Sequence, residues 1–308
     1  SDSRTIGLII QSVRAVFSFL GTIFTLITMT AIVCCLSLGG IFWVYGRDLP
    51  SHKSLAQYKP PTISRIYSAE GKIIDEFAKE RRLFTPANEI PALIKHAFIS
   101  SEDKNFYDHP GYDLRGILAA LVDAIQSRGK RIRGASTITQ QVMKNFLLDR
   151  SRRAERKVKE IILATRIERS LSKEQILELY LNEIFLGQNS YGVTAAPQTY
   201  FNKTLDELAP NEAAFLAALP KAPSDYHPVR EKSRLLERRI YVLKEMFQNE
   251  YLSKEVYEYE LTRPIRSVQG RDYAGFRSEL PSRNYFTDEI RRQLSRTFGE
   301  EEFFTGGM

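Results

Sequence analysis

The chain has 308 residues, which is enough for one sizeable core with accessory segments. Its net charge is +7, with 44 Lys and Arg against 37 Asp and Glu, and its pI is about 9.2. This balance suits an anionic partner such as nucleic acid, anionic lipid or a phosphorylated substrate, while two adjacent cysteines, Cys34 and Cys35, exclude a disulfide-stapled scaffold.

The 32 residues between Arg14 and Arg47 carry no charge, whereas a bilayer is crossed by about 20 apolar residues. We therefore predict a cytoplasmic tail over residues 1–14 and a transmembrane helix over residues 15–46. A cleaved signal peptide is the weaker alternative, because no small-residue cleavage site follows the apolar run. The arginines before the span favour a cytoplasmic N-terminus and an exported remainder.

Residues 47–80 are predicted to form a linker that contains a small β-hairpin. Three prolines fall in its first part. Residues 64–68 and 72–77 are rich in strand formers and flank Ala69-Glu70-Gly71, which is typical of a hairpin turn. This hairpin either packs against another element or bridges the membrane and the following domain.

A helical pattern then leads to the residue on which the functional hypothesis depends. Ile94, Ala97 and Phe98 lie on one helical face, and the next residue on that face is Glu102. Desolvation at the end of an apolar stripe would raise the pKa of this carboxyl and make Glu102 a candidate general base. Pro110-Gly111 is expected to stop the helix and turn the chain. The alternative is an ordinary solvated helix end.

The segment after Gly111 combines an apolar stripe with a basic region. Leu114 to Ile125 has amphipathic helical spacing, for which ordinary core packing is the simpler interpretation. The stretch 127–134 is basic and its two glycines suggest a mobile loop. Between Arg128 and Glu160 there are eleven Lys or Arg against three Asp or Glu, a local excess of +8. Apolar residues recur through this run, which argues against a solvated tail.

Arg156, Lys157 and Glu160 share one face of a predicted helix. They form either a surface ion pair worth a few tenths of a kcal/mol or a cationic clamp on a diphosphate, with Glu160 orienting the cations. The local excess of positive charge favours the clamp.

The C-terminal half is expected to be helical up to about residue 262. Ser172 and Gln175 form a capping-box pattern that starts a helix through Asn182. Pro210 opens a helix over 211–219 that Pro220 stops. Further helices are predicted over 231–249 and 253–262, and the chain after residue 263 is expected to be polar and irregular.

Several blocks resemble the signatures of the peptidoglycan glycosyltransferases of family 51, which occur alone or as the first catalytic domain of class A penicillin-binding proteins. The resemblance covers roughly residues 62–228, with Ala135 in place of a glycine of the second signature. The blocks are Glu102-Asp103-Lys104-Asn105-Phe106 with His109-Pro110-Gly111, Arg133 to Gln141 with Lys144-Asn145, Arg156-Lys157 with Glu160, Lys173 to Asn182, Gly187 to Lys203, and Glu212 to Pro223.

The resemblance implies a mostly α-helical, lysozyme-like glycosyltransferase domain over residues 81–228, followed by a helical extension over 229–308 that begins the linker to a transpeptidase domain. In the family resembled, the helices after the first signature form a lobe that dips into the membrane surface, so membrane contact is the second interpretation of the apolar stripe from Leu114 to Ile125. Two Ser-x-x-Lys patterns lack the partner motifs of a transpeptidase, so the chain looks truncated at Met308. We expect Glu102 and Glu160 to be catalytic. The substrate-binding residues implied are Asp103, Lys104, Phe106, His109, Gly134, Ser136, Thr137, Gln140, Gln141, Lys144, Asn145, Arg156, Lys157, Glu178 and Asn182. For Glu178 and Asn182, one turn apart, the residues themselves favour a structural role.

By the same resemblance the chain polymerises lipid II into β-1,4 glycan by inverting transfer, with release of undecaprenyl diphosphate. The expected partners are lipid II, the lipid-linked glycan, membrane lipid and other cell-wall synthesis proteins, without nucleic acid. The expected location is the bacterial inner membrane, with the domain on the periplasmic or extracellular side. We expect no required cofactor, with Mg²⁺ or Mn²⁺ as an optional cation. A lysozyme-like or lytic hydrolase and a non-catalytic membrane scaffold remain the alternatives.

Overall fold

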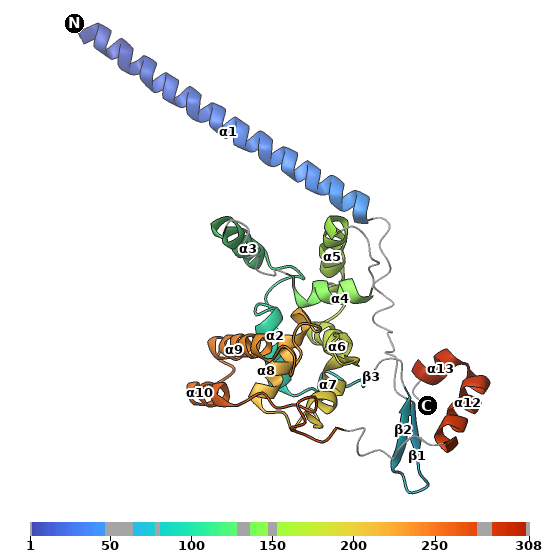
Figure 1. Cartoon of the computed structure of the whole chain (residues 1–308). Coiled ribbons are helices and arrows are strands. Elements are labelled where there is room, and N and C mark those ends of the chain that lie inside the picture. Colours follow the sequence, from blue (N-terminus) through green and yellow to red (C-terminus); the bar gives the residue numbers. More distant parts are fainter. Residues whose placement is uncertain are drawn as a thin grey trace.

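The computed structural model describes residues 2–46, 64–77, 81–127, 136–146, 153–275 and 285–305. Most of these residues are helical (Figure 1). The first half of the chain contains α1 (Asp2–Gly46), β1 (Ser64–Tyr67), β2 (Ile73–Phe77), β3 (Arg81–Arg82), α2 (Ala92–Glu102), α3 (Leu114–Gln126), α4 (Ile138–Phe146) and α5 (Arg153–Ile167). The second half contains α6 (Lys173–Glu183), β4 (Ser190–Tyr191), α7 (Gly192–Phe201), α8 (Pro210–Ala218), η2 (Leu219–Lys221), α9 (Lys232–Gln248), α10 (Lys254–Thr262), α12 (Tyr285–Phe298) and α13 (Glu300–Thr305).

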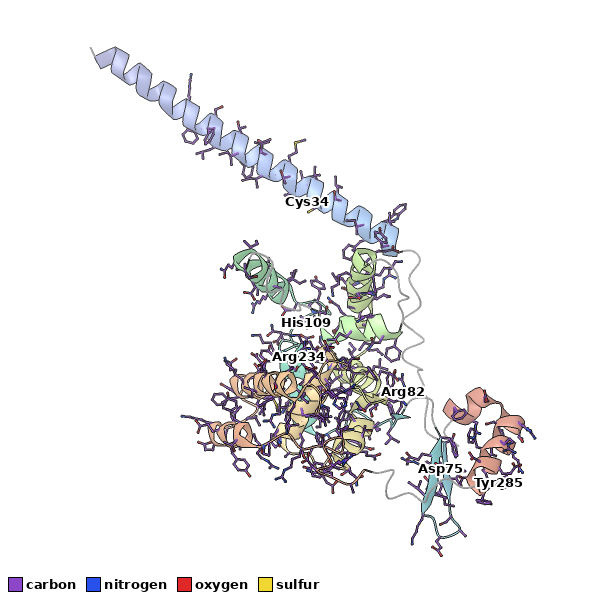
Figure 2. The ribbon with its side chains drawn as sticks, viewed as in Figure 1. Cys34, Asp75, Arg82, His109, Arg234 and Tyr285 are labelled. Atoms are coloured by element: carbon purple, nitrogen blue, oxygen red, sulfur yellow. The ribbon has the colours of Figure 1, made fainter. Side chains whose placement is uncertain are left out.

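Helix α1 extends away from the rest of the described structure, and its C-terminal end lies beside α5 (Figure 1). Its segment Phe17–Tyr45 has a mean hydropathy of 2.2 and none of it is buried within the protein. The Cys34 side chain, for example, is exposed on the surface of this helix (Figure 2). The length and composition are sufficient to cross a membrane, as the sequence predicted, although the helix already begins at Asp2.

The predicted β-hairpin is confirmed, and it packs against helices that were not expected in the C-terminal part of the chain. Strands β1 and β2 pair antiparallel, with Ser64 opposite Phe77. The hairpin lies beside α12 and α13, away from the main helical body (Figure 1). The Phe77 and Phe303 rings pack with their centroids 5.4 Å apart. The expectation of irregular chain after residue 263 is confirmed over residues 263–275, which form turns and coil, but it was wrong for α12 and α13, the second of which packs on the hairpin.

The main body is built around α8, whose residues from Asn211 to Ala218 are all buried. Its four alanines leave room for close approach of α2 and α9, which pack against it. Ile94, Ala97 and Phe98 of α2 are fully buried, so the predicted apolar face of that helix is confirmed. Helix α2 is therefore fixed on one side, and its last residue, Glu102, has a defined position.

The boundaries of the later helices follow local chemistry. Ser172 and Gln175 form both halves of the predicted capping box at the start of α6. Ser253 caps α10 in the same way through its hydroxyl, which accepts from the Val256 amide. Pro220 does not simply stop α8, because it lies inside η2. These local signals make helix starts the most predictable part of this fold.

Helix α3 contradicts the expectation of core packing. Leu118 is 60% exposed and Ile125 70% exposed, and Leu114 and Val122 are also open to solvent. The helix projects from the body on the side that faces α1 (Figure 1). An apolar helical face of this size without a protein partner marks an interaction surface. The adjoining basic stretch predicted as a mobile loop lies mostly outside the described residues.

Candidate functional site

A cleft of about 1080 Å³ opens between α2, α4, α5, the segment after α8, and α9. A smaller cavity of about 360 Å³ adjoins it, and the two share Ser101, Glu102, Ser136 and Tyr241. Glu102 thus lies where the two hollows meet. Of the residues predicted for the site, the cleft is lined by Glu102, Ser136, Gln140, Gln141, Lys144, Arg156, Lys157 and Glu160.

The Glu102 carboxylate is held by uncharged donors. Gln141 Nε2 donates to Glu102 Oε2 at 2.9 Å, and the Ser101 hydroxyl lies 3.4 Å from Oε1. The Arg238 guanidinium lies 3.6 Å from Oε1, and donates to the Ser101 hydroxyl at 3.1 Å. The side chain of Glu102 is only 13% exposed. The carboxylate is therefore fixed in position but only loosely paired with a cation.

Burial raises the pKa of the Glu102 carboxyl above its ordinary value. The hydrogen bond from Gln141 and the charge of Arg238 lower this pKa, but they do not outweigh the loss of water. This is the direction predicted from the apolar stripe of α2. A carboxylate with a raised pKa accepts a proton more readily, which is the property required of a general base at neutral pH.

The opposite wall carries a cation network on α5. Lys157 Nζ donates to Ser136 Oγ at 2.8 Å, to Gln140 Oε1 at 2.7 Å and to Glu160 Oε2 at 3.1 Å. Arg156 Nε lies 3.4 Å from Glu160 Oε1. Glu160 is buried and its carboxylate holds both cations at helical spacing, as predicted. The wall therefore presents fixed positive charge to the cleft.

Two polar groups of α4 remain available on the same wall. Gln140 is buried, and its Nε2 has no hydrogen-bond partner among the described residues. Lys144 lines the cleft, is exposed, and forms no ion pair within the part of the chain that the structure describes. A buried amide donor and an uncompensated ammonium are suited to an anionic group that enters the cleft.

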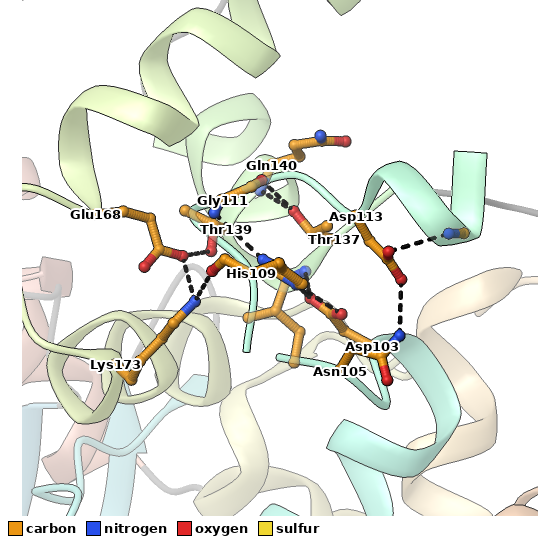
Figure 3. Close-up of polar contacts among 12 residues, drawn as sticks. Asp103, Asn105, His109, Gly111, Asp113, Thr137, Thr139, Gln140, Glu168 and Lys173 are labelled. Atoms are coloured by element: carbon orange, nitrogen blue, oxygen red, sulfur yellow. Dashed lines mark hydrogen bonds and ion pairs between the residues drawn. The ribbon is translucent and has the colours of Figure 1, made fainter. Parts of the chain in front are cut away.

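Behind Glu102, a buried pair joins the loop after α2 to the start of α4. The Asp103 carboxylate contacts His109 Nε2 at 2.9 Å and accepts the Ile138 amide at 2.9 Å (Figure 3). Thr137 donates its hydroxyl to the carbonyl of Gly111 at 2.7 Å. These contacts fix α2 relative to α4, and through α4 they position Gln141 against Glu102.

Gly111 and Phe106 also help to fix the loop between α2 and α3. Gly111 has a φ of +95°, and a Cβ there would lie 2.7 Å from the Ala164 carbonyl oxygen, so only glycine fits. Phe106 is fully buried, with the Lys173 ammonium 4.6 Å from its ring centroid. The helix itself ends at Glu102, eight residues before Pro110, so the prediction that Pro110-Gly111 stops it was wrong.

The remaining predicted residues lie elsewhere. Asp103, Lys104 and Thr137 line the smaller cavity. Asn145 is exposed, and Gly134 lies outside the described residues. Glu178 accepts the Ala87 amide, and Asn182 pairs with the backbone of Thr85. These last two side chains hold the segment before α2 rather than lining the cleft, which agrees with the structural role favoured from the residues.

Sequence reasoning missed the contribution of α9. Arg234, Arg238 and Tyr241 line the cleft from this helix, and the Arg238 guanidinium stacks on the Tyr241 ring at 4.5 Å (Figure 2 labels Arg234). Their spacing of four and three residues is the signal that would have revealed a shared helical face. This face brings a cation to Glu102.

Among the described residues, no three His, Cys, Asp or Glu side chains gather closely enough to hold a metal ion. The arrangement as a whole combines a positioned base with fixed cations across a cleft. It can remove a proton from a hydroxyl group and stabilise an anionic leaving group.

Comparison with known proteins identifies a family model and relatives that match most of this chain. A family model described as Transglycosylase matches residues 70–247. Penicillin-binding protein 1A of Rickettsia felis is 47% identical over 271 residues, which are 87% of this chain and 34% of that protein. Penicillin-binding protein 1A of Haemophilus influenzae is 45% identical over 243 residues, which are 79% of this chain and 28% of that protein.

A crystal structure of penicillin-binding protein 1A from Haemophilus influenzae aligns with 81% of this chain and 26% of its own, at 32% identity and a TM-score of 0.47. The chain spans about a third of the length of its Rickettsia relatives.

Proposed function

Because this chain belongs to the transglycosylase family, we propose that it is a peptidoglycan glycosyltransferase that polymerises lipid II into β-1,4-linked glycan strands. The observation that carries the proposal is the placement of Glu102 and the Lys157–Glu160 network in one cleft. The roles of the individual residues, the substrate and the leaving group are parts of this proposal.

In the reaction, Glu102 removes the proton from the sugar 4-hydroxyl of an incoming lipid II molecule. The resulting oxygen attacks the anomeric carbon of the lipid-linked chain from the face opposite the leaving group. A glycosidic C–O bond forms, the bond to the diphosphate oxygen breaks, and undecaprenyl diphosphate departs with the bonding electron pair. The proton remains on the Glu102 carboxyl until solvent removes it. The raised pKa and the hydrogen bond from Gln141 suit this side chain to the task.

The departing diphosphate gains negative charge as the bond breaks. Lys144, Arg156 and Lys157 face the cleft and stabilise that charge where it develops. Glu160 holds Arg156 and Lys157 in place before the reaction, so little reorganisation is needed. A glycoside hydrolase requires a carboxylic acid to protonate its leaving oxygen, whereas a diphosphate leaves without one. The cation network therefore favours transfer over hydrolysis.

The membrane geometry supports a lipid-linked substrate. Helix α1 is long enough to span a bilayer, and the exposed apolar face of α3 lies on the side of the body toward α1 (Figure 1). We infer that α3 rests in the membrane surface and that the catalytic body lies on the periplasmic or extracellular side. Lipid II then reaches the cleft without leaving the bilayer. Other cell-wall synthesis proteins are the expected protein partners, and nucleic acid is not.

The direct test is polymerisation of fluorescently labelled lipid II by the full chain in detergent or liposomes. Products that lengthen with time, and that lysozyme digests, support the proposal. Degradation of purified glycan strands would instead identify a hydrolase. A folded protein that leaves lipid II and glycan unchanged would identify a scaffold.

A further inference from the structure

A cavity of about 350 Å³ lies away from the cleft, between α8, α9, α10 and the segment 263–273. It shares no lining residue with the cleft or with the smaller cavity beside Glu102. The reaction proposed above makes no use of it. Its volume lies at the lower end of the range for small-molecule sites, which runs from about 300 to about 1,000 Å³.

The charges around this cavity are mostly positive. Arg239, Arg263 and Arg266 line it, and the acidic residue among its lining residues is Glu212. The Glu212 carboxylate is already neutralised, because Lys203 Nζ lies 2.8 Å from its Oε1 and 2.9 Å from its Oε2. The cavity therefore has cations without a matching free anion among its lining residues.

Arg239 is the most constrained of these cations. It is 1% exposed, and its Nη2 donates to the Arg263 carbonyl at 2.8 Å. Its Nε and Nη1 have no hydrogen-bond partner among the described residues. Glu260 acts on this guanidinium through space, but its Oε2 accepts the Asn211 amide at 3.3 Å and forms no ion pair with Arg239 in the described structure. Burial lowers the pKa of the Arg239 guanidinium, a sign that water no longer compensates its charge.

The rest of the lining is mainly apolar or aromatic, with Asn211 and Thr262 as its other uncharged polar residues. Phe201, Phe215 and Ile265 are buried, and the rings of Tyr259 and Tyr273 also line the cavity. A free phosphate would meet the guanidinium groups but would leave the apolar part of this lining without a ligand contact. A carboxylate carried on a short apolar stem matches both parts, since its oxygens accept from guanidinium groups while the stem contacts the rings.

We propose that this cavity, which we call the α8–α10 pocket, binds the C-terminal carboxylate of a partner protein whose last residue is apolar. Its lining residues Arg239, Arg263 and Arg266 provide the donors, and Arg266 is exposed at its mouth, where it first meets the ligand. Arginine suits this role because its planar fork offers paired donors to a carboxylate. The pocket then docks a protein partner on a face that catalysis leaves free.

The experiment measures binding of N-acetyl-leucine to the full chain in detergent by equilibrium dialysis. Its matched control is N-acetyl-leucinamide, which has the same stem without the carboxylate, and inorganic phosphate is the second comparison. We expect saturable binding of the acid, at least about tenfold weaker binding of the amide, as charged hydrogen bonds are lost, and no effective competition by phosphate. Equal binding of acid and amide, no saturable binding, or competition by phosphate at equal concentration would overturn the proposal.

Variants locate the site. Arg266→Gln removes an exposed guanidinium and is expected to weaken binding of the acid about tenfold without altering the fold. Arg169→Gln is the control, since Arg169 is also exposed but does not line the pocket. Unchanged binding by Arg266→Gln, or equal weakening by Arg169→Gln, would show that the carboxylate binds elsewhere. Arg239→Lys should weaken binding of the acid more than Arg266→Gln does, because lysine lacks the paired donors of the guanidinium group. The result counts if thermal unfolding of this variant remains cooperative.

Discussion

The two walls of the cleft each contain a carboxylate that is largely removed from solvent, but the surroundings of the two differ. Glu102 on α2 receives hydrogen bonds from uncharged side chains, and its cation, Arg238, stays 3.6 Å away. Glu160 on α5 has two cations within 3.4 Å. A carboxylate that is weakly paired keeps its affinity for a proton, whereas a strongly paired one holds its cations in place. The same residue type therefore serves as base on one wall and as an anchor for charge on the other.

The largest effect is expected from removing the base. Glu102→Gln keeps the size of the side chain and its contact with Gln141 but cannot accept a proton. Glycan elongation should fall by about 10²- to 10⁴-fold, the usual contribution of general base catalysis. The measurement is the initial rate of labelled lipid II polymerisation. The exposed Glu258→Gln on α10 is the matched control, since it makes the same chemical change far from the cleft.

Thermal unfolding of Glu102→Gln separates loss of the base from loss of the fold. Because the folded-state pKa of Glu102 is raised, its charge disfavours folding above that pKa, and this penalty is absent below the pKa of the unfolded chain. The amide removes the penalty, so the melting temperature at neutral pH should stay equal or rise. Wild-type turnover in this variant would reject the assigned role, and a lower melting temperature would contradict the description of its environment.

Removing the Glu160 carboxylate from the α5 wall should lower the rate of glycan elongation nearly as much as Glu102→Gln does. Glu160→Gln leaves Arg156 and Lys157 without the carboxylate that positions them. The rate of elongation should fall by about a hundredfold, comparable to loss of one electrostatic stabiliser of a transition state. Steady-state kinetics on lipid II give this number. Retained activity would reduce Glu160 to a structural ion pair.

A smaller effect is expected from Arg238 of α9, the cation nearest to Glu102. The Arg238 cation lowers the pKa of Glu102, so Arg238→Gln should raise that pKa further. The base is active when ionised, so the acidic limb of the rate profile should move to higher pH. Near neutral pH the rate should drop up to about tenfold, since one pKa unit changes the ionised fraction by at most that factor.

At high pH the wild type and Arg238→Gln should converge, because both bases are then ionised. Arg238→Lys, which keeps the charge, should lie closer to the wild type throughout. A profile of Arg238→Gln that superimposes on the wild type would show that Arg238 does not act on the base.

The smallest effect is expected on contact between α3 and the membrane, and not on the glycosyl transfer itself. Leu118→Gln on the exposed face of α3 should reduce the rate of lipid II polymerisation in liposomes about fivefold, in line with partial burial of one leucine. Polymerisation in detergent should be unchanged. Val256→Gln on α10 is the control, since that valine is 39% exposed on a helix away from α1. Equal loss in both variants would contradict membrane contact by α3.

Much of this architecture could be predicted from local chemistry. The capping box at Ser172, the apolar face of α2 and the charged face of α5 each depend on residues within one or two turns. Such short-range patterns survive folding unchanged, so helix starts and the two carboxylates were found. The raised pKa of Glu102 followed from one stripe of apolar residues.

The misses have a common physical origin in contacts between distant segments. Helices α12 and α13 were read as irregular because the surface they cover, the hairpin of residues 64–77, lies more than two hundred residues earlier in the chain. The apolar face of α3 looked like core because a sequence does not show whether a partner exists. Arg238 was missed because it reaches Glu102 only after α9 packs on α2. The assigned roles of the cleft residues stay predictions.

The account depends on Glu102 as a base whose pKa is raised by burial, and the pH dependence of kcat/KM for lipid II tests this most directly. We predict an acidic limb whose midpoint lies above 4.5, the ordinary value for glutamate. Activity should fall as the pH drops through that midpoint, and the limb should be missing from the residual activity of Glu102→Gln. A wild-type profile that stays flat down to pH 4.5, or an identical limb in Glu102→Gln, would contradict the account.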